Sequence, residues 1–173
     1  MSCDTLQDAL SAELTLHAKD IITVKQLILN GADVNYQSSD GWCLLFELVS
    51  LGLSKHLIQL KQYGLDIDVR DFKGRNALFW AIYHENVDVL ESLIHLGYNL
   101  DLNVTAKLPA LHYAVYKNNS KIVNTLLSHS YDLNRKDMYE QTALDYAYYY
   151  NRQEMITLLK KWGASTANLG HMM

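Results

Sequence analysis

Apolar residues recur along the chain in pairs of short stretches that have helical spacing. Leu78, Ala81 and Ile82 form one such stretch, and after a short break a second stretch runs from Val87 to Ile94. Spacings of three and four residues place these side chains on one face of a helix. Each pair of stretches therefore predicts two short amphipathic helices joined by a tight turn.

The phrase GADVN, at residues 31–35, returns in weaker form after each predicted helix pair. Its glycine recurs at multiples of 33 residues, at Gly31, Gly64, Gly97 and Gly163, with Ser130 in the one remaining place. A second signature keeps the same spacing of 33 residues, at Leu45, Leu78, Leu111 and Leu144. Two independent signatures in one phase predict a stack of equal structural units.

The break inside each predicted helix pair requires a residue that tolerates left-handed backbone geometry. Gly52, Asn118 and Asn151 occupy this place, and Asn is the next best choice after Gly. Glu85 fills the same place in the third unit and fits it less well. The repeated glycines follow the second helix, where a C-terminal cap is expected.

Residues 38–165 resemble the ankyrin repeat family. The family unit reads roughly D-x-x-G-x-T-P-L-H-x-A, then a Gly between two helices, then I-V-x-x-L-L-x-x-G-A-D-V-N. The T-P-L-H element appears here as CLLF, NALF, PALH and TALD, beginning at residues 43, 76, 109 and 142. The family His survives only at His112, where the resemblance implies that it braces a hairpin by hydrogen bonds.

The expected fold is an all-α ankyrin-repeat solenoid of helix-turn-helix units joined by β-hairpin-like loops. We place a single domain at residues 1–165, with units at about 5–37, 38–70, 71–103, 104–136 and 137–165. One unit cannot bury its apolar face alone, so we expect the stacking of neighbours to stabilise the array. Residues 166–173 have no counterpart in the repeat, and we expect a flexible tail there.

Composition and charge narrow the classes of function. The chain has 173 residues, of which 49% are hydrophobic, and its 15 basic residues against 19 acidic ones include no basic run, so we expect no nucleic-acid or membrane partner. No apolar stretch approaches the roughly 20 residues of a membrane helix. The first 20 residues do not resemble a secretory signal, and two cysteines are too few for a disulfide framework. These features favour a cytoplasmic location. The alternative is delivery into another cell as a secreted effector, for which no recognisable signal is expected in the sequence.

The motifs of common catalytic and metal sites are missing from the sequence. The seven histidines are scattered, without H-x-x-x-H or C-x-x-C spacing. No G-x-S-x-G, G-x-G-x-x-G or G-x-x-x-x-G-K motif occurs, so neither a nucleophile elbow nor a phosphate-binding loop is indicated. We therefore expect no catalytic residue, no metal site and no cofactor, and we predict that the protein is not an enzyme.

In the ankyrin family, the hairpin tips and the exposed side of the first helix form a concave surface that binds other proteins. The resemblance implies a set of candidate partner-binding residues at the matching positions: Trp42, Phe72, Arg75, Tyr83, His84, Leu108, Tyr116, Met138, Tyr139, Tyr149 and Tyr150. Large amphipathic rings and Arg are enriched in binding hot spots. The predicted function of these residues is therefore recognition rather than chemistry.

Tyr83, Tyr116 and Tyr149 are equivalent residues of three consecutive units, and we expect them to stack as a ladder along one face. A second set, two residues after the repeated Leu, is expected to pack between units instead: Trp80, Tyr113 and Tyr146. For Trp42 there is an alternative to partner binding, in which its ring folds back over the neighbouring hairpin.

The leading hypothesis is a protein-protein interaction module, an adaptor or inhibitor that binds a partner protein of unknown identity through its concave face. We expect such a module to be monomeric. The alternative is structural: the same aromatic face could join two copies of the chain into a homodimer. Fold alone does not choose between these functions.

Overall fold

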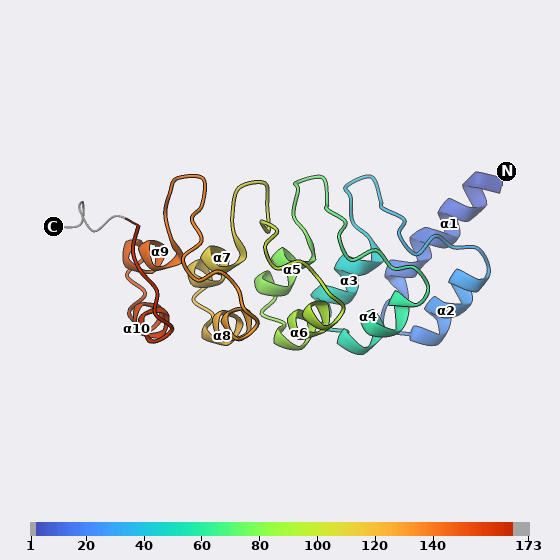
Figure 1. The fold of residues 1–173 in the computed structure, drawn as a ribbon. Helices are drawn as coiled ribbons and strands as arrows, with labels where there is room; N and C mark the ends of the chain where they lie inside the picture. The colour runs from blue at the N-terminus through green and yellow to red at the C-terminus, as the bar shows by residue number, and fades with distance from the viewer. Residues whose placement is uncertain (1–2, 168–173) are drawn as a thin grey trace.

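The computed structural model describes residues 3–167 and contains ten α-helices, which form five pairs in a row (Figure 1). The first helices of the pairs are α1 (Cys3–Leu16), α3 (Leu44–Ser50), α5 (Ala77–Tyr83), α7 (Ala110–Tyr116) and α9 (Ala143–Tyr149). The second helices are α2 (Ile21–Leu29), α4 (Ser54–Lys61), α6 (Val87–His95), α8 (Ser120–Ser128) and α10 (Gln153–Lys161). The five pairs form the expected all-α solenoid of helix-turn-helix units.

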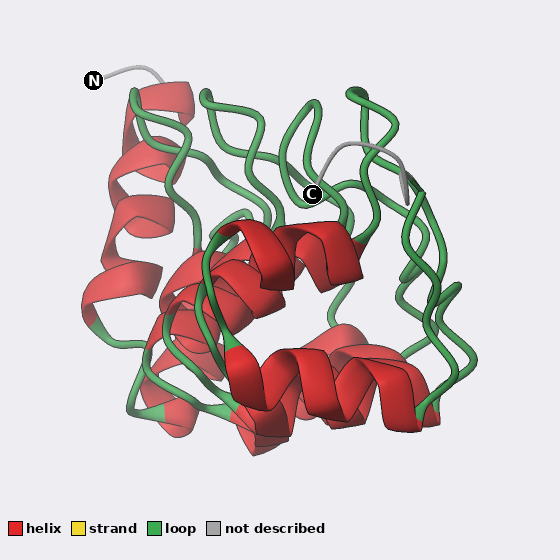
Figure 2. Ribbon diagram, turned by 90° about the vertical axis from the view of Figure 1, so that its left-hand side faces the viewer, coloured by secondary structure: helices red, strands yellow, loops and turns green. Residues whose placement is uncertain are grey.

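The helices form two layers, with the first helices in one and the second helices in the other, and the connecting loops extend to one side (Figure 2). α1 is longer than the other first helices and is inclined to them (Figures 1 and 2). The expected flexible tail lies mostly outside the described residues, at 168–173. Ala167 is described, and its backbone N–H donates a hydrogen bond to Asp145 Oδ2 at 3.1 Å.

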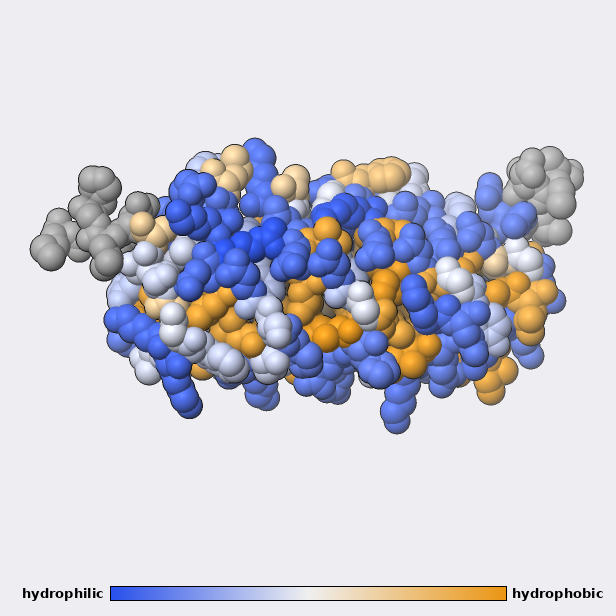
Figure 3. Space-filling model, viewed as in Figure 1, coloured by the Kyte–Doolittle hydropathy of each residue, from blue (hydrophilic) through white to orange (hydrophobic). Residues whose placement is uncertain are grey.

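The core follows the repeat. Leu45, Leu78, Leu111 and Leu144 are all exposed by 2% or less. Fully burying such a side chain contributes about 1.5–3 kcal/mol relative to leaving it in water. Cys43 belongs to the same core, and desolvation raises the pKa of its thiol to about 11. On the face shown in Figure 3, apolar residues reach the surface only in patches along the stack, between hydrophilic ones.

The turns between the paired helices of the second to fifth units have the left-handed geometry that the sequence predicts. The backbone φ angle is +72° at Gly52, +59° at Glu85, +58° at Asn118 and +51° at Asn151. Only Glu85 lacks the tolerance for left-handed geometry that Gly and Asn have. The turn geometry is thus set by the repeat and is imposed on Glu85 by its neighbours.

Three of the four loops between units close as hairpins with a single antiparallel bridge, at Gln37–Cys43, Arg70–Asn76 and Lys136–Thr142. In two of them a carboxylate at the start of the tip organises the backbone. Asp71 Oδ1 accepts hydrogen bonds from the N–H groups of Lys73 and Arg75, both at 2.9 Å. Asp137 Oδ1 does the same for Tyr139 and Gln141.

Val104 takes the equivalent place in the loop before α7 and cannot accept such bonds. That loop is closed by the Val104 N–H, which donates to the Leu108 carbonyl at 2.8 Å. The carbonyl of Asn103, the residue before Val104, accepts a hydrogen bond from the Arg70 guanidinium at 2.9 Å. The neighbouring unit therefore supplies part of the bracing that this loop's own residues lack.

His112 is fully buried, and its Nε2 lies 2.8 Å from the carbonyl oxygen of Gln141 in the next hairpin. Because the carbonyl can only accept, Nε2 carries the proton and donates. The bracing role implied by the family resemblance is confirmed at this position. Desolvation lowers the pKa of His112, which keeps the ring neutral near pH 7.

Candidate protein-binding face

The first helices and the loops before them carry a connected series of aromatic rings. We call it the aromatic row, and its members are Trp42, Phe46, Phe79, Trp80, Tyr83, His84, Tyr113, Tyr116, Tyr146, Tyr149 and Tyr150. A path of contacting rings leads from Trp42 in the second unit to Tyr149 in the fifth, with no centroid separation above 6.2 Å. These separations are typical of favourable aromatic pairs.

Trp42 begins the row, and it is half-buried rather than free at the hairpin tip. Its indole N–H donates a hydrogen bond to Glu47 Oε2 at 2.9 Å. Its ring meets the ring of Trp80 edge to face, with centroids 4.9 Å apart. The ring therefore packs over the neighbouring unit, as in the alternative to partner binding, although its contact there is with α5 rather than with the hairpin.

Trp80 is buried and packs between units, as the sequence predicts. The guanidinium carbon of Arg75 lies 4.3 Å from the centroid of its ring. Arg75 Nε also forms an ion pair of 2.6 Å with the carboxylate of Asp71. Arg75, a predicted binding residue, is thus half-buried, with its charge paired and its flat face on an indole.

The three tyrosines that were expected to form a ladder end three successive first helices and are exposed. Tyr83 is exposed by 47%, Tyr116 by 46% and Tyr149 by 73%. Within residues 3–167, however, the ring contacts pair none of them with another of the three. The expected direct stack is therefore not formed, although all three rings remain accessible to a partner.

Rings one turn earlier in the helices make the connection instead. Phe79 and Tyr113 stack with centroids 4.8 Å apart and an interplanar angle of 9°. Tyr83 lies beside Phe79 at 6.0 Å, and Tyr116 lies beside Tyr113 at 6.2 Å. Helix axes in neighbouring units lie about 8–10 Å apart, so rings at the helix ends do not reach each other across that gap unless they turn into it.

The carboxyl-terminal part of the row is centred on Tyr150. Its ring contacts Tyr116 at 5.2 Å and Tyr149 at 4.9 Å, both nearly edge to face. Tyr146 packs between units as expected: its ring meets His112 at 4.9 Å and its hydroxyl donates to Asp137 Oδ2 at 2.8 Å. Desolvation and this hydrogen bond to a carboxylate raise the pKa of Tyr146, so its hydroxyl stays protonated.

Lys117 gives the middle of the row a positive charge, beside the ring of His84. Lys117 Nζ lies 4.8 Å from the centroid of the Tyr83 ring, a cation-π contact between neighbouring units. The His84 ring stacks on Trp80 at 5.9 Å and meets Tyr83 edge to face at 5.0 Å. Desolvation lowers the pKa of His84, and the nearby Lys117 charge lowers it further. At neutral pH the positive charge here is therefore that of Lys117.

The remaining predicted residues divide into exposed and half-buried ones. Phe72, Met138 and Tyr139, at hairpin tips, are exposed by 71%, 51% and 68%. Leu108 is half-buried against the core. The tips of the hairpins at residues 71–75 and 137–141 thus add apolar contact surface beside the row, whereas Leu108 contributes mainly to packing.

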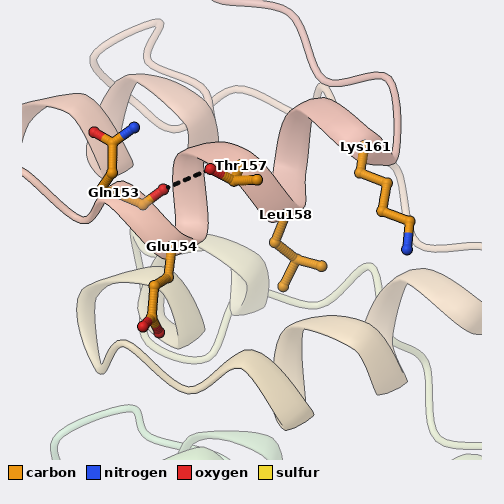
Figure 4. Close-up of a pocket in the computed structure, with 5 residues that line it drawn as sticks. All are labelled: Gln153, Glu154, Thr157, Leu158 and Lys161. Carbon is orange, nitrogen blue, oxygen red and sulfur yellow. Dashed lines mark hydrogen bonds between the residues drawn. The ribbon is translucent and has the colours of Figure 1, made fainter.

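The pockets of the described residues offer little for chemistry. One, of about 360 Å³, is lined by α10 alone, by Gln153, Glu154, Thr157, Leu158 and Lys161 (Figure 4). In it the Thr157 hydroxyl donates to the Gln153 carbonyl at 3.0 Å, a bond within the helix. Across residues 3–167, His, Cys, Asp and Glu side chains do not gather in threes that could hold a metal ion. None of the described helices is both long and apolar enough to span a membrane.

A family model for ankyrin repeats, in three copies, matches residues 14–106 and 101–168. The chain belongs to the ankyrin repeat family. Ankyrin repeats are generally protein-protein interaction modules and typically have no enzymatic activity. The chain is also 32% identical, over 98 residues, to the inactive serine/threonine-protein kinase TEX14 of Bos taurus. The match covers 56% of this chain and 7% of that relative.

Phe79 and Lys117 contribute to this ankyrin face and were not among the predicted binding residues. Phe79 stands where the family has the bracing His, and in the preceding repeat the same place holds Phe46. This replacement of a polar brace by an aromatic ring was the available signal. For Lys117 the sequence shows a basic residue next to Tyr116, but its contact with Tyr83 arises only from the stacking of units.

Proposed function

We propose that this ankyrin array binds another protein through its aromatic row and the hairpin tips beside it, and acts as an adaptor or inhibitor. The observation that carries the proposal is the exposure of Tyr83, Tyr116 and Tyr149 at one equivalent place in three successive repeats. Phe79 and Tyr113 stack on each other between the third and fourth repeats, so the exposed rings of Tyr83 and Tyr116 themselves are available for contact.

The row is also held rigidly, which favours recognition. The rings pack on one another and on helices whose opposite sides are buried in the core. A surface of fixed aromatic side chains loses little conformational entropy on binding. Affinity would then depend on a few anchoring rings rather than on total buried area.

The test is quantitative affinity capture with the wild-type chain and a Tyr83→Ala, Tyr116→Ala, Tyr149→Ala triple variant. A matched control removes three exposed apolar side chains elsewhere, on α2 and α4: Ile22→Ala, Leu29→Ala and Ile58→Ala. We expect partners that the wild type and the control recover equally to be lost from the tyrosine variant. Equal recovery by all three proteins would refute binding through the row.

Self-association through the same face is the alternative use of these residues. Light scattering over a concentration series separates the two functions, because a homodimer shows a mass that rises with concentration. We expect a monomer up to high micromolar concentration. A dimer that the tyrosine triple variant abolishes would assign the row to self-association instead.

A further inference from the structure

We propose that the segment bound by the aromatic row is an extended acidic peptide, with one carboxylate on Lys117 and apolar side chains on successive repeats. This inference rests on the proposed function, because it concerns the same face. It adds the charge, the conformation and the side-chain spacing of the partner.

The charge of the partner follows from how the charged groups near the row are paired. Arg75 and Asp71 neutralise each other. Two carboxylates keep their negative charge at the ends of the row, Glu47 beside Trp42 and Asp137 beside Tyr146, because each accepts a hydrogen bond from a neutral donor there. Lys117 is in none of the ion pairs found between residues 3 and 167, and its amine rests on the Tyr83 ring instead. The centre of the row thus holds one cation, Lys117, between carboxylates at its two ends, in a chain with a formal net charge of −4.

The loops on either side support the same sign. Lys73 and Lys107 lie exposed in the loops before α5 and α7, and neither forms an ion pair among the described residues. Exposed carboxylates also lie nearby: Glu85, in the turn after α5, lines a pocket together with Asp88 and Lys121, and Asp40 and Glu140 lie at the hairpin tips of the second and fifth units. A carboxylate placed on the row would therefore meet Lys117 at contact and two further cations near the tips.

The position of Lys117 favours a partner that places a carboxylate there over a partner that makes only apolar contacts. Its amine is already fixed over a ring in the neighbouring repeat, so little side-chain entropy remains to be lost when an anion binds. His84, beside it, is kept neutral by desolvation and by the Lys117 charge, and it can donate a hydrogen bond without adding a second charge. The centre of the row therefore offers one cation, Lys117, and one neutral hydrogen-bond donor, His84.

The conformation of the partner follows from the repeat spacing. First helices of neighbouring units lie about 8–10 Å apart. An extended chain rises about 3.1–3.3 Å per residue, so every third residue advances by roughly one repeat. In a polyproline II segment these residues, at i, i+3 and i+6, also lie on one face.

A helical partner fits this face less well. An α-helix rises about 1.5 Å per residue and so advances by one repeat only after about six residues, and its contacts at i+3 and i+4 must enter the space between repeats. That space is filled here by the stacked rings of Phe79 and Tyr113. The row thus presents an accessible tyrosine at the end of the first helix in three successive repeats, Tyr83, Tyr116 and Tyr149, and the fifth repeat adds Tyr150 beside Tyr149.

The experiment is selection of random peptides of about 12 residues, long enough to cross three repeats when extended, on the immobilised wild-type chain. Enriched peptides are synthesised with a fluorophore and their Kd is measured by anisotropy. We expect Asp or Glu together with apolar residues spaced by three. We expect Lys117→Glu to raise the Kd about tenfold or more, and added salt to weaken binding. Lys55→Glu on α4, an equal change of charge outside the row, should leave the Kd within about twofold.

Several outcomes would overturn the inference. They are enrichment of basic peptides, apolar spacing of four and seven, an unchanged Kd in Lys117→Glu, or no enrichment at all. Tighter binding of a fluorescent oligothymidine than of any peptide would assign the row to single-stranded nucleic acid. The proposed function is tested separately with the Tyr83, Tyr116 and Tyr149 triple alanine variant. It is supported if this variant binds the selected peptides more weakly than the wild type does, whatever the composition of those peptides.

Discussion

The ring of Phe79 lies parallel to the ring of Tyr113 in the next repeat, with centroids 4.8 Å apart and an interplanar angle of 9°. This pair joins two repeats and also supports the accessible tyrosines, because Tyr83 rests beside Phe79 and Tyr116 beside Tyr113. Packing between repeats and the candidate binding surface are therefore built from the same helices.

The stacked pair should show a measurable coupling energy. In a double-mutant cycle with Phe79→Leu and Tyr113→Leu, which keep apolar volume, we expect a coupling of about 0.5–1.5 kcal/mol in the free energy of unfolding. Urea denaturation of the four proteins measures it. As a control, Phe79→Leu and Trp162→Leu, in different repeats, should be additive. A coupling of zero between Phe79 and Tyr113 would mean that the rings contribute only their buried area.

His112 should make stability depend on pH. Burial lowers its pKa in the folded state, whereas in the unfolded chain the pKa is about 6.5. As pH falls below that value the unfolded chain binds the proton first, so the free energy of unfolding is highest above pH 6.5 and decreases below it. Urea titrations between pH 7.5 and pH 5 should show this decrease.

The matched variant is His112→Phe, because Phe46 and Phe79 occupy the equivalent position in two other repeats. It loses the hydrogen bond to the Gln141 carbonyl, which should cost about 1–3 kcal/mol at pH 7.5. Its pH dependence should be shallower than that of the wild type, with a residual slope from His84, whose pKa is also lowered. An unchanged slope would exclude His112 as the source.

Two hairpin glycines with similar backbone angles should differ in their tolerance of a methyl group. Gly41 and Gly74 have φ angles of +79° and +72°. A Cβ on Gly41 would lie 2.6 Å from the backbone nitrogen of Phe72 in the next hairpin, whereas nothing lies within 4 Å of a Cβ on Gly74. Gly74→Ala should cost about 1–2 kcal/mol for the left-handed geometry alone. Gly41→Ala should cost about 1–3 kcal/mol more, and equal shifts in Tm would disprove the close approach of the hairpins.

Glu85→Gly should stabilise the protein. Glu85 has a φ angle of +59°, and left-handed geometry costs a residue with a Cβ about 1–2 kcal/mol. The greater entropy of glycine in the unfolded chain offsets part of this, so we expect a net gain of about 0.5–1 kcal/mol, seen as a higher Tm. Asn118→Gly, at the matching turn of the next repeat, should change the Tm little. A lower Tm for Glu85→Gly would show that its side chain makes a stabilising contact.

Much of the fold was predictable because the same local sequence pattern recurs in each repeat. The spacing of Leu45, Leu78, Leu111 and Leu144 predicted the buried positions, and Gly52, Asn118 and Asn151 predicted the left-handed turns. The interunit packing of Trp80, Tyr113 and Tyr146 also followed from their register. These features depend on periodicity and on backbone preferences, which a sequence states directly.

The face was predicted less completely. The repeat spacing identified Tyr83, Tyr116 and Tyr149 as equivalent positions. It does not determine which rings contact each other or which ring fills the gap between neighbouring helices. Phe79 and Tyr113 fill that gap, and Trp42 turns away from the tip towards Trp80. Such choices depend on side-chain rotamers and on the partners that neighbouring repeats offer.

The sequence by itself determined the repeat, the ten helices and the set of equivalent positions in each repeat. The hydrophobic period and the turn residues determine these features because they act on the local backbone conformation. Only the tertiary structure decided which aromatic rings touch, that Arg75 is neutralised by Asp71, and that Lys117 rests on Tyr83 with no acidic partner among the described residues. Contacts between residues about 33 positions apart depend on the stacking of whole units, and stacking is settled by how the side chains of both units fill the shared space.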